Sequence, residues 1–299
     1  MKPREILYLL GFRSGPKTYG YQMNTFALPK DGPVQYAQWL HPKQTETVIS
    51  QAAVDELGRF LSPGDVAIDI GAHTGDTTIP IALAVGVTGC VLAIEPNKYV
   101  FPFLKKNSEL NPDKTNIVPL MLAATPADGE YEFEYSDPGL CNGGLHEGIS
   151  KRRHCHAFKL KVQGMNLQSH LEKNYPDLLP RIRFIKVDAE GYDYAILATL
   201  SQLISTQKPY IKAEFFKLTS HGQRQKLYQF LSDHGYTIYR IKSDADYMGE
   251  TVERQNLMRW RQFDVFCVPH GAAANRDPSE SAHGILRRDT KAPDKADVF

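Results

Sequence analysis

The sequence has few cysteines, no excess of charge of one sign and no long apolar runs. Only 4 of its 299 residues are cysteines, and no Cys-x-x-Cys pair occurs. Cysteines this few and this scattered do not form the disulfide framework of a small secreted domain. A chain of this length buries about 75% of its unfolded surface on folding. Its core therefore needs neither disulfides nor a structural metal.

The near balance of charge excludes one broad class of partner. The 35 Lys and Arg residues are matched by 34 Asp and Glu residues, which leaves a formal net charge of +1. Proteins that bind nucleic acid by bulk electrostatics normally carry a strongly basic domain. We therefore expect no bulk nucleic-acid binding. The balance is consistent with a small-molecule partner, and no pattern indicates the oligomeric state.

Apolar runs of membrane-spanning length are also missing. None approaches the roughly 18 residues that a transmembrane helix needs. The apolar stretch after the charged start covers only residues 6–12, and no small-residue cleavage site of a secretory signal follows it. The sequence therefore predicts no membrane span and a cytoplasmic location.

What the sequence does contain is an alternation of short apolar runs with helical patterns. This alternation is typical of βαβ units and of a mostly parallel α/β sheet flanked by helices, that is, a Rossmann-like fold. The last two predicted strands indicate one antiparallel member near an edge of the sheet. The predicted strands are residues 66–70, 90–94, 116–122, 182–187, 210–213, 236–241 and 263–268, with further β-rich segments at 131–135 and 156–162.

The two ends of the chain differ in composition from this alternating part. Residues 1–45 are rich in Gly, Pro, Tyr and Gln without periodicity, which predicts an N-terminal extension with short strands or turns but no core of its own. Residues 271–299 are polar and predict a disordered tail or a weakly docked arm. One domain of residues 46–270 remains.

The turn after the first buried strand carries the most chemical information. Asp69 stands two residues before Gly71, and Gly75 lies where a helix begins, so that Pro80 falls in the first turn of that helix. Backbone N–H groups at a helix start are unpaired and lie at the positive end of the helix dipole. Glycines let the backbone approach a ligand without a Cβ. The turn therefore predicts a site for a polar or anionic ligand group.

An acidic residue at the end of the next strand points to a nucleoside cofactor. Glu95 follows the glycines at about the sequence spacing that is typical of an acidic residue whose carboxylate accepts hydrogen bonds from both ribose hydroxyls. With Ala72 and His73 in the turn, the chain lacks the Gly-x-Gly-x-x-Gly pattern that clears space for the pyrophosphate of NAD. Asp69 would repel a pyrophosphate but can order a cationic amino-acid end, directly or through water. This favours S-adenosylmethionine, the alternative being that Asp69 only caps the turn.

Several further blocks follow these motifs in a fixed order. The blocks are residues 68–75, 95–97, 105–107, 123–124, 185–191 and 210–214, of which Ile-Lys-Val-Asp-Ala-Glu-Gly at 185–191 is the most specific. Together they resemble the FkbM-type S-adenosylmethionine-dependent methyltransferases. The resemblance covers about residues 45–217 and departs from the family at His73, where Asn is frequent, and at Pro80.

The resemblance implies a class I methyltransferase fold and a role for each matched residue. Residues 69–77 would hold the methionine part of the cofactor, Glu95 its ribose and Ala123–Ala124 its adenine, while Asp188 would face the methyl group. The implied reaction is O-methyl transfer to a hydroxyl of a small acceptor, commonly a sugar or natural product. The predicted cofactor-binding residues are Asp69, Gly71, Ala72, His73, Gly75, Thr77, Glu95, Asn97, Ala123, Ala124 and Asp188.

Three residues are candidates for the base that removes the proton of the acceptor hydroxyl. Asp188 is the first choice because carboxylates at strand ends face the cleft of such sheets, and its alternative role is cofactor positioning alone. Glu214 ends the neighbouring strand. His146 lies in the loop of residues 136–155, for which an acceptor-binding lid and an exposed variable loop are both open interpretations.

Metal binding is considered and not favoured. Asp188 and Glu214 offer the hard oxygen ligands that suit Mg²⁺. Residues 141–156 contain two Cys and three His, but their spacing fits no zinc motif. The leading hypothesis is an S-adenosylmethionine-dependent O-methyltransferase. The alternatives are an NAD-binding oxidoreductase and a cofactor-binding module without catalysis.

Overall fold

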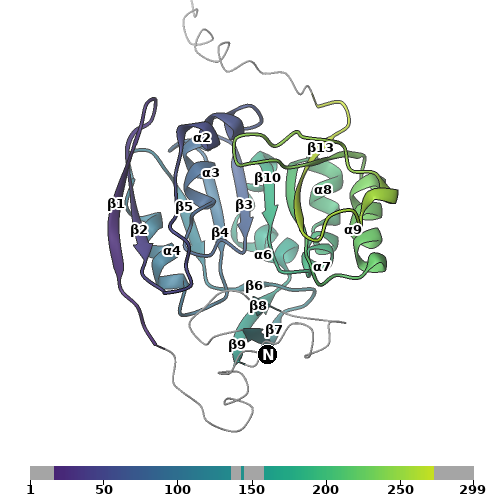
Figure 1. The fold of residues 1–299 in the computed structure, drawn as a ribbon, viewed down its shortest axis with the longest axis horizontal. Coiled ribbons are helices and arrows are strands. Elements are labelled where there is room, and N and C mark those ends of the chain that lie inside the picture. The colour runs from purple at the N-terminus through teal and green to yellow at the C-terminus, as the bar shows by residue number, and fades with distance from the viewer. Residues whose placement is uncertain (1–16, 136–142, 145–157, 273–299) are drawn as a thin grey trace, which may run out of the picture.

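A seven-stranded sheet forms the centre of the molecule in the computed structural model, which describes residues 17–135, 143–144 and 158–272 (Figure 1). Within this sheet β13 runs antiparallel to both of its neighbours, and the other neighbouring pairs are parallel. The predicted α/β sheet, with one antiparallel strand near an edge, is confirmed. The spatial order is β12 (Tyr236–Arg240), β13 (Phe263–Pro269), β11 (Tyr210–Phe215), β10 (Ile182–Val187), β3 (Val66–Ile70), β4 (Cys90–Ile94) and β5 (Ile117–Leu120).

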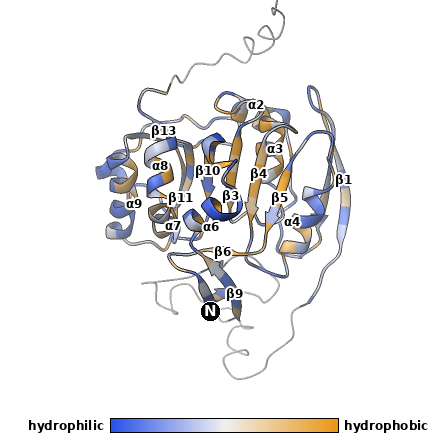
Figure 2. Cartoon of the chain, turned by 180° about the vertical axis from the view of Figure 1, so that it is seen from behind, coloured by the Kyte–Doolittle hydropathy of each residue, from blue (hydrophilic) through white to orange (hydrophobic). Residues whose placement is uncertain are grey.

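Helices cover both faces of this sheet, because alternate side chains of each strand point to opposite sides. Ile68 and Ile185 belong to the core beneath α7, α8 and α9, whereas Ala67 and Phe184 belong to the core beneath α2 and α3. Figure 2 shows the apolar residues concentrated in central strands such as β4. The helices are α2 (Gln51–Gly58), α3 (Thr78–Val85), α4 (Phe101–Ser108), α6 (Leu167–Asn174), α7 (Asp193–Thr199), α8 (Ser201–Gln207) and α9 (His221–Asp233), with short 3-10 turns η1 (Leu179–Arg181) and η2 (Arg254–Asn256).

Two of the observed helix boundaries differ from those that periodicity predicts. The pattern over residues 45–61 predicts one long helix, but α2 begins only after Ser50, whose side chain accepts a hydrogen bond from the N–H of Ala53. The helix predicted over residues 192–204 is divided at Leu200 into α7 and α8. Pro80 lies in the first turn of α3, as predicted.

The N-terminal extension folds as a hairpin of β1 (Tyr21–Leu28) and β2 (Gly32–Trp39). Its buried side chains do not form a separate core, because Val34 and Tyr36 pack with Ile79 of α3. Asn107 of α4 accepts a hydrogen bond from the N–H of Ala37 (2.6 Å) and donates one through Nδ2 to the carbonyl of Thr74 (2.7 Å). The hairpin is therefore attached to the turn that follows β3.

A second, smaller sheet lies beyond the carboxyl ends of the central strands (Figure 1). Its order is β6-β9-β7-β8, and β9 pairs with β6 in parallel and with β7 in antiparallel fashion. Apart from β8, the predicted loop of residues 136–155 lies outside the described residues, as does nearly all of the predicted tail. The strands are β6 (Ala123–Ala124), β7 (Gly129–Tyr135), β8 (Gly143–Gly144) and β9 (Phe158–Met165).

The helices of the described residues are too short, or too polar, to cross a lipid bilayer. The cytoplasmic location stays a prediction.

The attachment of the hairpin gives a first test. The hydroxyl of Tyr36 is fully buried, lies 2.7 Å from Oγ1 of Thr74 and accepts a hydrogen bond from Thr47 (3.4 Å). Tyr36→Phe removes these contacts, and we expect the free energy of unfolding in urea to fall by about 1 kcal/mol. Tyr21→Phe, at an exposed position of β1, is the control and should change it by less than about 0.5 kcal/mol. Equal effects of the two substitutions would contradict the described attachment.

Candidate functional site

A cavity of about 280 Å³ opens at the carboxyl ends of β3, β4 and β10. The chain runs outward from β3 through β4 to β5 and then returns to β10 on the other side of β3. Ligands of doubly wound sheets bind where the strand order reverses in this way. Phe133 and Tyr135 of the smaller sheet close one side of the cavity, and Tyr192 and Ile196 close another.

The turn after β3 is held against β10 so closely that it requires glycine. Gly71 has a φ of +75°, and a Cβ at this position would lie 2.2 Å from the carbonyl oxygen of Asp188. The N–H of Gly71 donates to the carbonyl of Ile94 (3.0 Å), and the N–H of Asp188 donates to that of Ile70 (3.1 Å). The turn is therefore tied to both neighbouring strands and presents a fixed backbone to the cavity.

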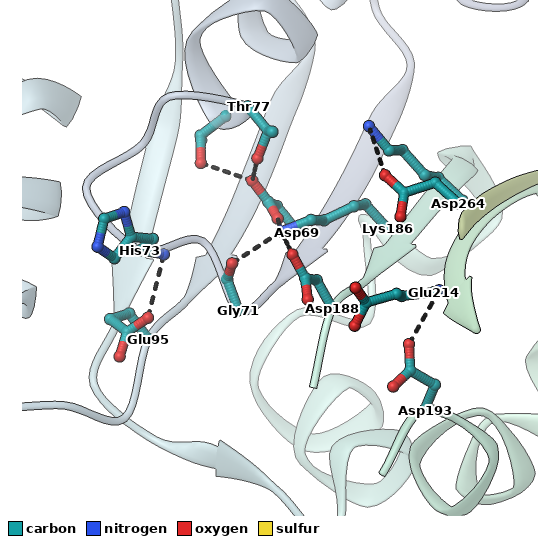
Figure 3. Close-up of polar contacts among 12 residues, drawn as sticks. Asp69, Gly71, His73, Thr77, Glu95, Lys186, Asp188, Asp193, Glu214 and Asp264 are labelled. Carbon is teal, nitrogen blue, oxygen red and sulfur yellow. Dashed lines mark hydrogen bonds and ion pairs between the residues drawn. The ribbon is translucent and has the colours of Figure 1, made fainter. Parts of the chain in front are cut away.

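Asp69 is completely buried behind this turn (Figure 3). Its Oδ2 accepts hydrogen bonds from the hydroxyls of Thr77 (3.0 Å) and Thr78 (2.6 Å), and its Oδ1 lies 3.1 Å from Nζ of Lys186. Asp69 does not belong to the residues that line the cavity. Its carboxylate fixes the start of α3 and the ammonium of Lys186.

Lys186 is the buried cation at the centre of the site. Its Nζ donates to the carbonyl of Gly71 (2.7 Å) and lies 3.9 Å from Oδ2 of Asp188 (Figure 3). Burial opposes the charged form, but the carboxylates of Asp69, Asp188 and Asp76 outweigh it and raise the pKa of Lys186. This side chain keeps its charge and joins the turn after β3 to the end of β10.

Glu95 is buried at the end of β4 and lines the cavity. Its Oε2 accepts a hydrogen bond from the N–H of His73 (3.0 Å), and its Oε1 accepts one from the N–H of Asn97 (2.8 Å). Burial raises the pKa of Glu95 to about 7, although both hydrogen bonds act in the opposite direction. Asn97 thus orients Glu95 without lining the cavity itself.

His73 has a φ of +52°, a conformation that Asn and His adopt more readily than most residues. Its Nδ1 lies 3.3 Å from Oγ1 of Thr74, and its ring lies 6.0 Å from that of Trp39. Its Nε2 is buried and has no hydrogen-bond partner among the described residues. Burial lowers the pKa of His73, so its imidazole favours the neutral form.

Carboxyl groups gather at the ends of the next two strands (Figure 3). The side chain of Asp188 is 52% exposed, whereas those of Asp193 and Glu214 are buried. Asp193 accepts a hydrogen bond from the N–H of Glu214 (3.1 Å), and Gln262 donates one to the carboxyl group of Glu214. Burial, followed by the charges of Asp188 and Asp193, raises the pKa of Glu214 to about 9. Glu214 therefore carries a proton at neutral pH.

The structure brings many of the predicted site residues together. Those that line the cavity are Gly71, His73, Thr77, Glu95, Ala123, Ala124 and Asp188. Those that support or adjoin it without lining it are Asp69, Ala72, Gly75, Asn97 and Glu214. His146 lies outside the described residues.

Metal ligands do not gather in the part of the chain that the structure describes. There, no three His, Cys, Asp or Glu side chains lie close enough together to hold an ion. The pair of Asp188 and Glu214, considered for Mg²⁺, has no third such ligand among these residues. The two cysteines and three histidines of residues 141–156 lie outside them.

A comparison with known protein families decides the assignment. Residues 69–238 match the family described as the methyltransferase FkbM domain. The chain belongs to this family. The match begins at Asp69 and includes Glu95, Lys186 and Asp188, so the groups that build the cavity lie within it. Membership supports S-adenosylmethionine-dependent methyl transfer. No curated protein matches the sequence.

Solved structures with related folds are distant from this FkbM-family chain. A methyltransferase FkbM from Methylobacillus flagellatus KT is 16% identical, with a TM-score of 0.42, and the match covers 69% of this chain and 44% of that one. An S-adenosylmethionine-dependent O-methyltransferase from Thermotoga maritima is 11% identical, with a TM-score of 0.40, and the match covers 87% of this chain and 80% of that one. A precorrin-6y C5,15-methyltransferase from Geobacter metallireducens GS-15 is 14% identical, with a TM-score of 0.39, and the match covers 75% of this chain and 90% of that one.

Sequence reasoning missed several residues of the FkbM-family site. Lys186 could have been identified from the sequence, because it belongs to the most specific sequence block and precedes Asp188 by two residues on the same face of the strand. Asp76 directly follows Gly75 in the turn. Phe133 and Tyr135 gave no signal, because only the folding of the smaller sheet brings them to the cavity.

The raised pKa of Glu214 predicts how stability responds to pH. In the unfolded chain this carboxyl group loses its proton near pH 4.5, but in the folded chain only near pH 9. Between these values the folded state binds more protons, so stability falls as pH rises. Glu214→Gln removes this loss of stability. The free energy of unfolding of the variant, measured in urea and compared with that of the wild type, should therefore rise by about 1–3 kcal/mol between pH 5 and pH 8. Glu109→Gln, at an exposed position, should show no such gain. If the free energy of unfolding of Glu214→Gln changes with pH as that of the wild type does, the raised pKa of Glu214 is contradicted.

Proposed function

We propose that this FkbM-family protein transfers the methyl group of S-adenosylmethionine to a hydroxyl oxygen of a small acceptor. The observation that carries the proposal is the charge of the cavity. Four carboxyl side chains and one ammonium line it, namely Asp76, Glu95, Asp188, Glu190 and Lys186. An excess of carboxyl groups suits a cofactor that carries both a sulfonium and an ammonium group.

The cofactor fits the residues present. Glu95 keeps both carboxyl oxygens turned toward backbone N–H groups at the cavity wall, and each oxygen retains acceptor capacity for a ribose hydroxyl. Ala123 and Ala124 form a small-residue wall suited to the flat adenine ring. Bound S-adenosylmethionine would supply an electrophilic methyl group on its sulfonium.

The protein's contribution to the reaction is positioning and removal of one proton. Asp188 lines the cavity and is half exposed, so an acceptor can reach it. Lys186 lies 3.9 Å from Asp188 and fixes its carboxylate next to the turn. In-line attack on a methyl group gains most of its rate from such fixed geometry. Glu214 is a poorer candidate for the base, because a carboxyl group that holds its proton at neutral pH donates rather than accepts.

The NAD-dependent alternative is disfavoured by the same charges. The pyrophosphate of NAD would lie at the turn, next to Asp76 and within reach of Asp188. The N–H of Gly71, which a pyrophosphate would need, already donates to the carbonyl of Ile94. Family membership points the same way.

Calorimetry distinguishes the proposed methyltransferase from the NAD-dependent alternative. We expect the wild-type protein to bind S-adenosylhomocysteine and not NAD. Glu95→Ala should weaken this binding by about 1–3 kcal/mol, because it removes charge-assisted hydrogen bonds to the ribose. The exposed Glu109→Ala is the matched control and should bind as the wild type does. Binding of NAD but not of S-adenosylhomocysteine would falsify the proposal.

The role of Asp188 is tested by methyl transfer. Protein, S-adenosylmethionine with an isotopically labelled methyl group and a panel of hydroxylated acceptors are incubated together, and O-methylated products are identified by mass spectrometry. We expect Asp188→Asn to lower the rate about 10²- to 10⁴-fold, because the amide cannot accept the hydroxyl proton. Its affinity for S-adenosylhomocysteine should change much less than its rate. Unchanged turnover would show that Asp188 is dispensable.

A further inference from the structure

Glu190 lines the cavity at the carboxyl ends of β3, β4 and β10, two residues beyond Asp188. It is partly buried, and its carboxyl group has no hydrogen-bond or ion-pair partner among the described residues. Burial, followed by the charge of Asp188, raises the pKa of Glu190 to about 7, whereas Lys217 acts in the opposite direction. A bound cation would supply the partner that this carboxylate lacks.

The backbone at Glu190 is held in a conformation that glutamate rarely adopts. Its φ is +49°, in the left-handed region. Among the described residues other than glycine, His73 (φ +52°) and Lys208 (φ +49°) share this feature. Lys208 ends α8, where left-handed residues are common, whereas His73 and Glu190 both line the cavity. Backbone strain of this kind gathers at binding and active sites, so the conformation of Glu190 points to a ligand.

The other carboxyl groups that line the cavity differ from Glu190 in their surroundings. Both oxygens of Glu95 accept hydrogen bonds from backbone N–H groups, which suits the ribose. The carboxylate of Asp188 lies 3.9 Å from Nζ of Lys186, which offsets part of its charge. Asp76 belongs to the turn after β3, at the start of α3 and on the methionine side of the proposed cofactor site. Glu190 lies beyond β10, beside the junction of these methionine and ribose sides, where the sulfonium would lie.

We propose that the carboxylate of Glu190 faces the sulfonium of S-adenosylmethionine and makes the protein prefer this cofactor to its product, S-adenosylhomocysteine. This inference rests on the proposed function. Glu190 would act on the one positive charge that the two compounds do not share, whereas Asp76 would act on the ammonium that both carry. Methyl transfer removes the sulfonium charge, so the same carboxylate holds the product less tightly than the substrate.

Calorimetry measures this preference as the dissociation constant of S-adenosylhomocysteine divided by that of S-adenosylmethionine, without an acceptor. Glu190→Gln keeps the size of the side chain and removes its charge. We expect it to lower this ratio about tenfold, because a partly buried charge pair is lost. The affinity for S-adenosylhomocysteine should change less than about twofold. Sinefungin, which carries an ammonium in place of the transferred methyl group, should respond to the substitution as S-adenosylmethionine does.

Asp76→Asn is the matched control, because it removes a carboxylate from the same cavity. It should weaken the binding of both compounds by similar factors and leave their ratio unchanged. Glu190→Asp and Glu190→Asn form a second pair, which keeps the proposal testable if Glu190→Gln does not fold. Both residues tolerate a left-handed φ and have similar size, so they differ mainly in charge. The ratio should be higher for Glu190→Asp than for Glu190→Asn.

The dependence of the ratio on pH gives a readout that a merely structural role would not move. Loss of the proton of Glu190 should raise the ratio between pH 6 and pH 8 in the wild type, but not in Glu190→Gln. The other titratable groups near Glu190 remain in that variant, so the difference between the two profiles belongs to Glu190. These groups are His73, Asp76, Glu95, Tyr135, Lys186, Asp188 and Tyr192, which line the cavity, and Lys217.

Three results would overturn the proposal. If Glu190→Gln leaves the ratio as in the wild type, or weakens the binding of both compounds equally, Glu190 does not select the sulfonium. If Asp188→Asn lowers the ratio and Glu190→Gln does not, the selecting charge is that of Asp188. If Glu190→Asp and Glu190→Asn give equal ratios, charge at this position has no effect. Failure of the wild-type protein to bind either compound would instead overturn the proposed function, and this inference with it.

Discussion

The contact between Lys186 and the turn after β3 is the constraint on which the rest of the site depends. One ammonium joins the carboxylate of Asp69 (3.1 Å), the carbonyl of Gly71 (2.7 Å) and, more loosely, Asp188 (3.9 Å). Buried charges are costly unless they are paired and hydrogen-bonded. Because each partner lies on β3 or at the end of β10, pairing Lys186 requires these strands to be in register. The cofactor turn and Asp188 are thus positioned by the same interaction.

The turn is held from its other side by the N-terminal hairpin. Asn107 connects Ala37 of β2 to the carbonyl of Thr74, and the hydroxyl of Tyr36 contacts Oγ1 of the same threonine. Residues 1–45, predicted as an extension without its own core, therefore include part of the support of the site. Their sequence shows no motif for this, because the contacts are made by a tyrosine hydroxyl and a backbone amide that any hairpin could contain.

The sequence made the sheet predictable and indicated residues that the structure brings to one cavity, for a physical reason. Apolar runs, the glycines that follow them and acidic residues at their ends are local patterns, and they point to Gly71, Glu95 and Asp188, which line the cavity. The environment of a group is not local. Asp69 is predicted either to order the cationic end of the ligand, directly or through water, or only to cap the turn, and the structure buries it against Lys186, Thr77 and Thr78. The cavity at the carboxyl end of β11 could not be predicted, because Arg224 in its wall is bonded to segments more than thirty residues away in the sequence.

Charge differs along the edge of the sheet, where a further cavity of about 250 Å³ lies at the carboxyl end of β11. Four carboxyl groups and one ammonium line the first cavity, whereas two carboxyl and two basic side chains line the further one, and one of those carboxyl groups, Glu214, holds its proton at neutral pH. The near-zero net charge of the chain conceals this difference, because it sums the acidic cavity with the basic residues elsewhere. Transfer of the methyl group would remove the sulfonium charge of the proposed cofactor, so the acidic first cavity would lose part of its attraction for the cofactor product. The electrostatics of this cavity therefore favour release of the cofactor product after the transfer.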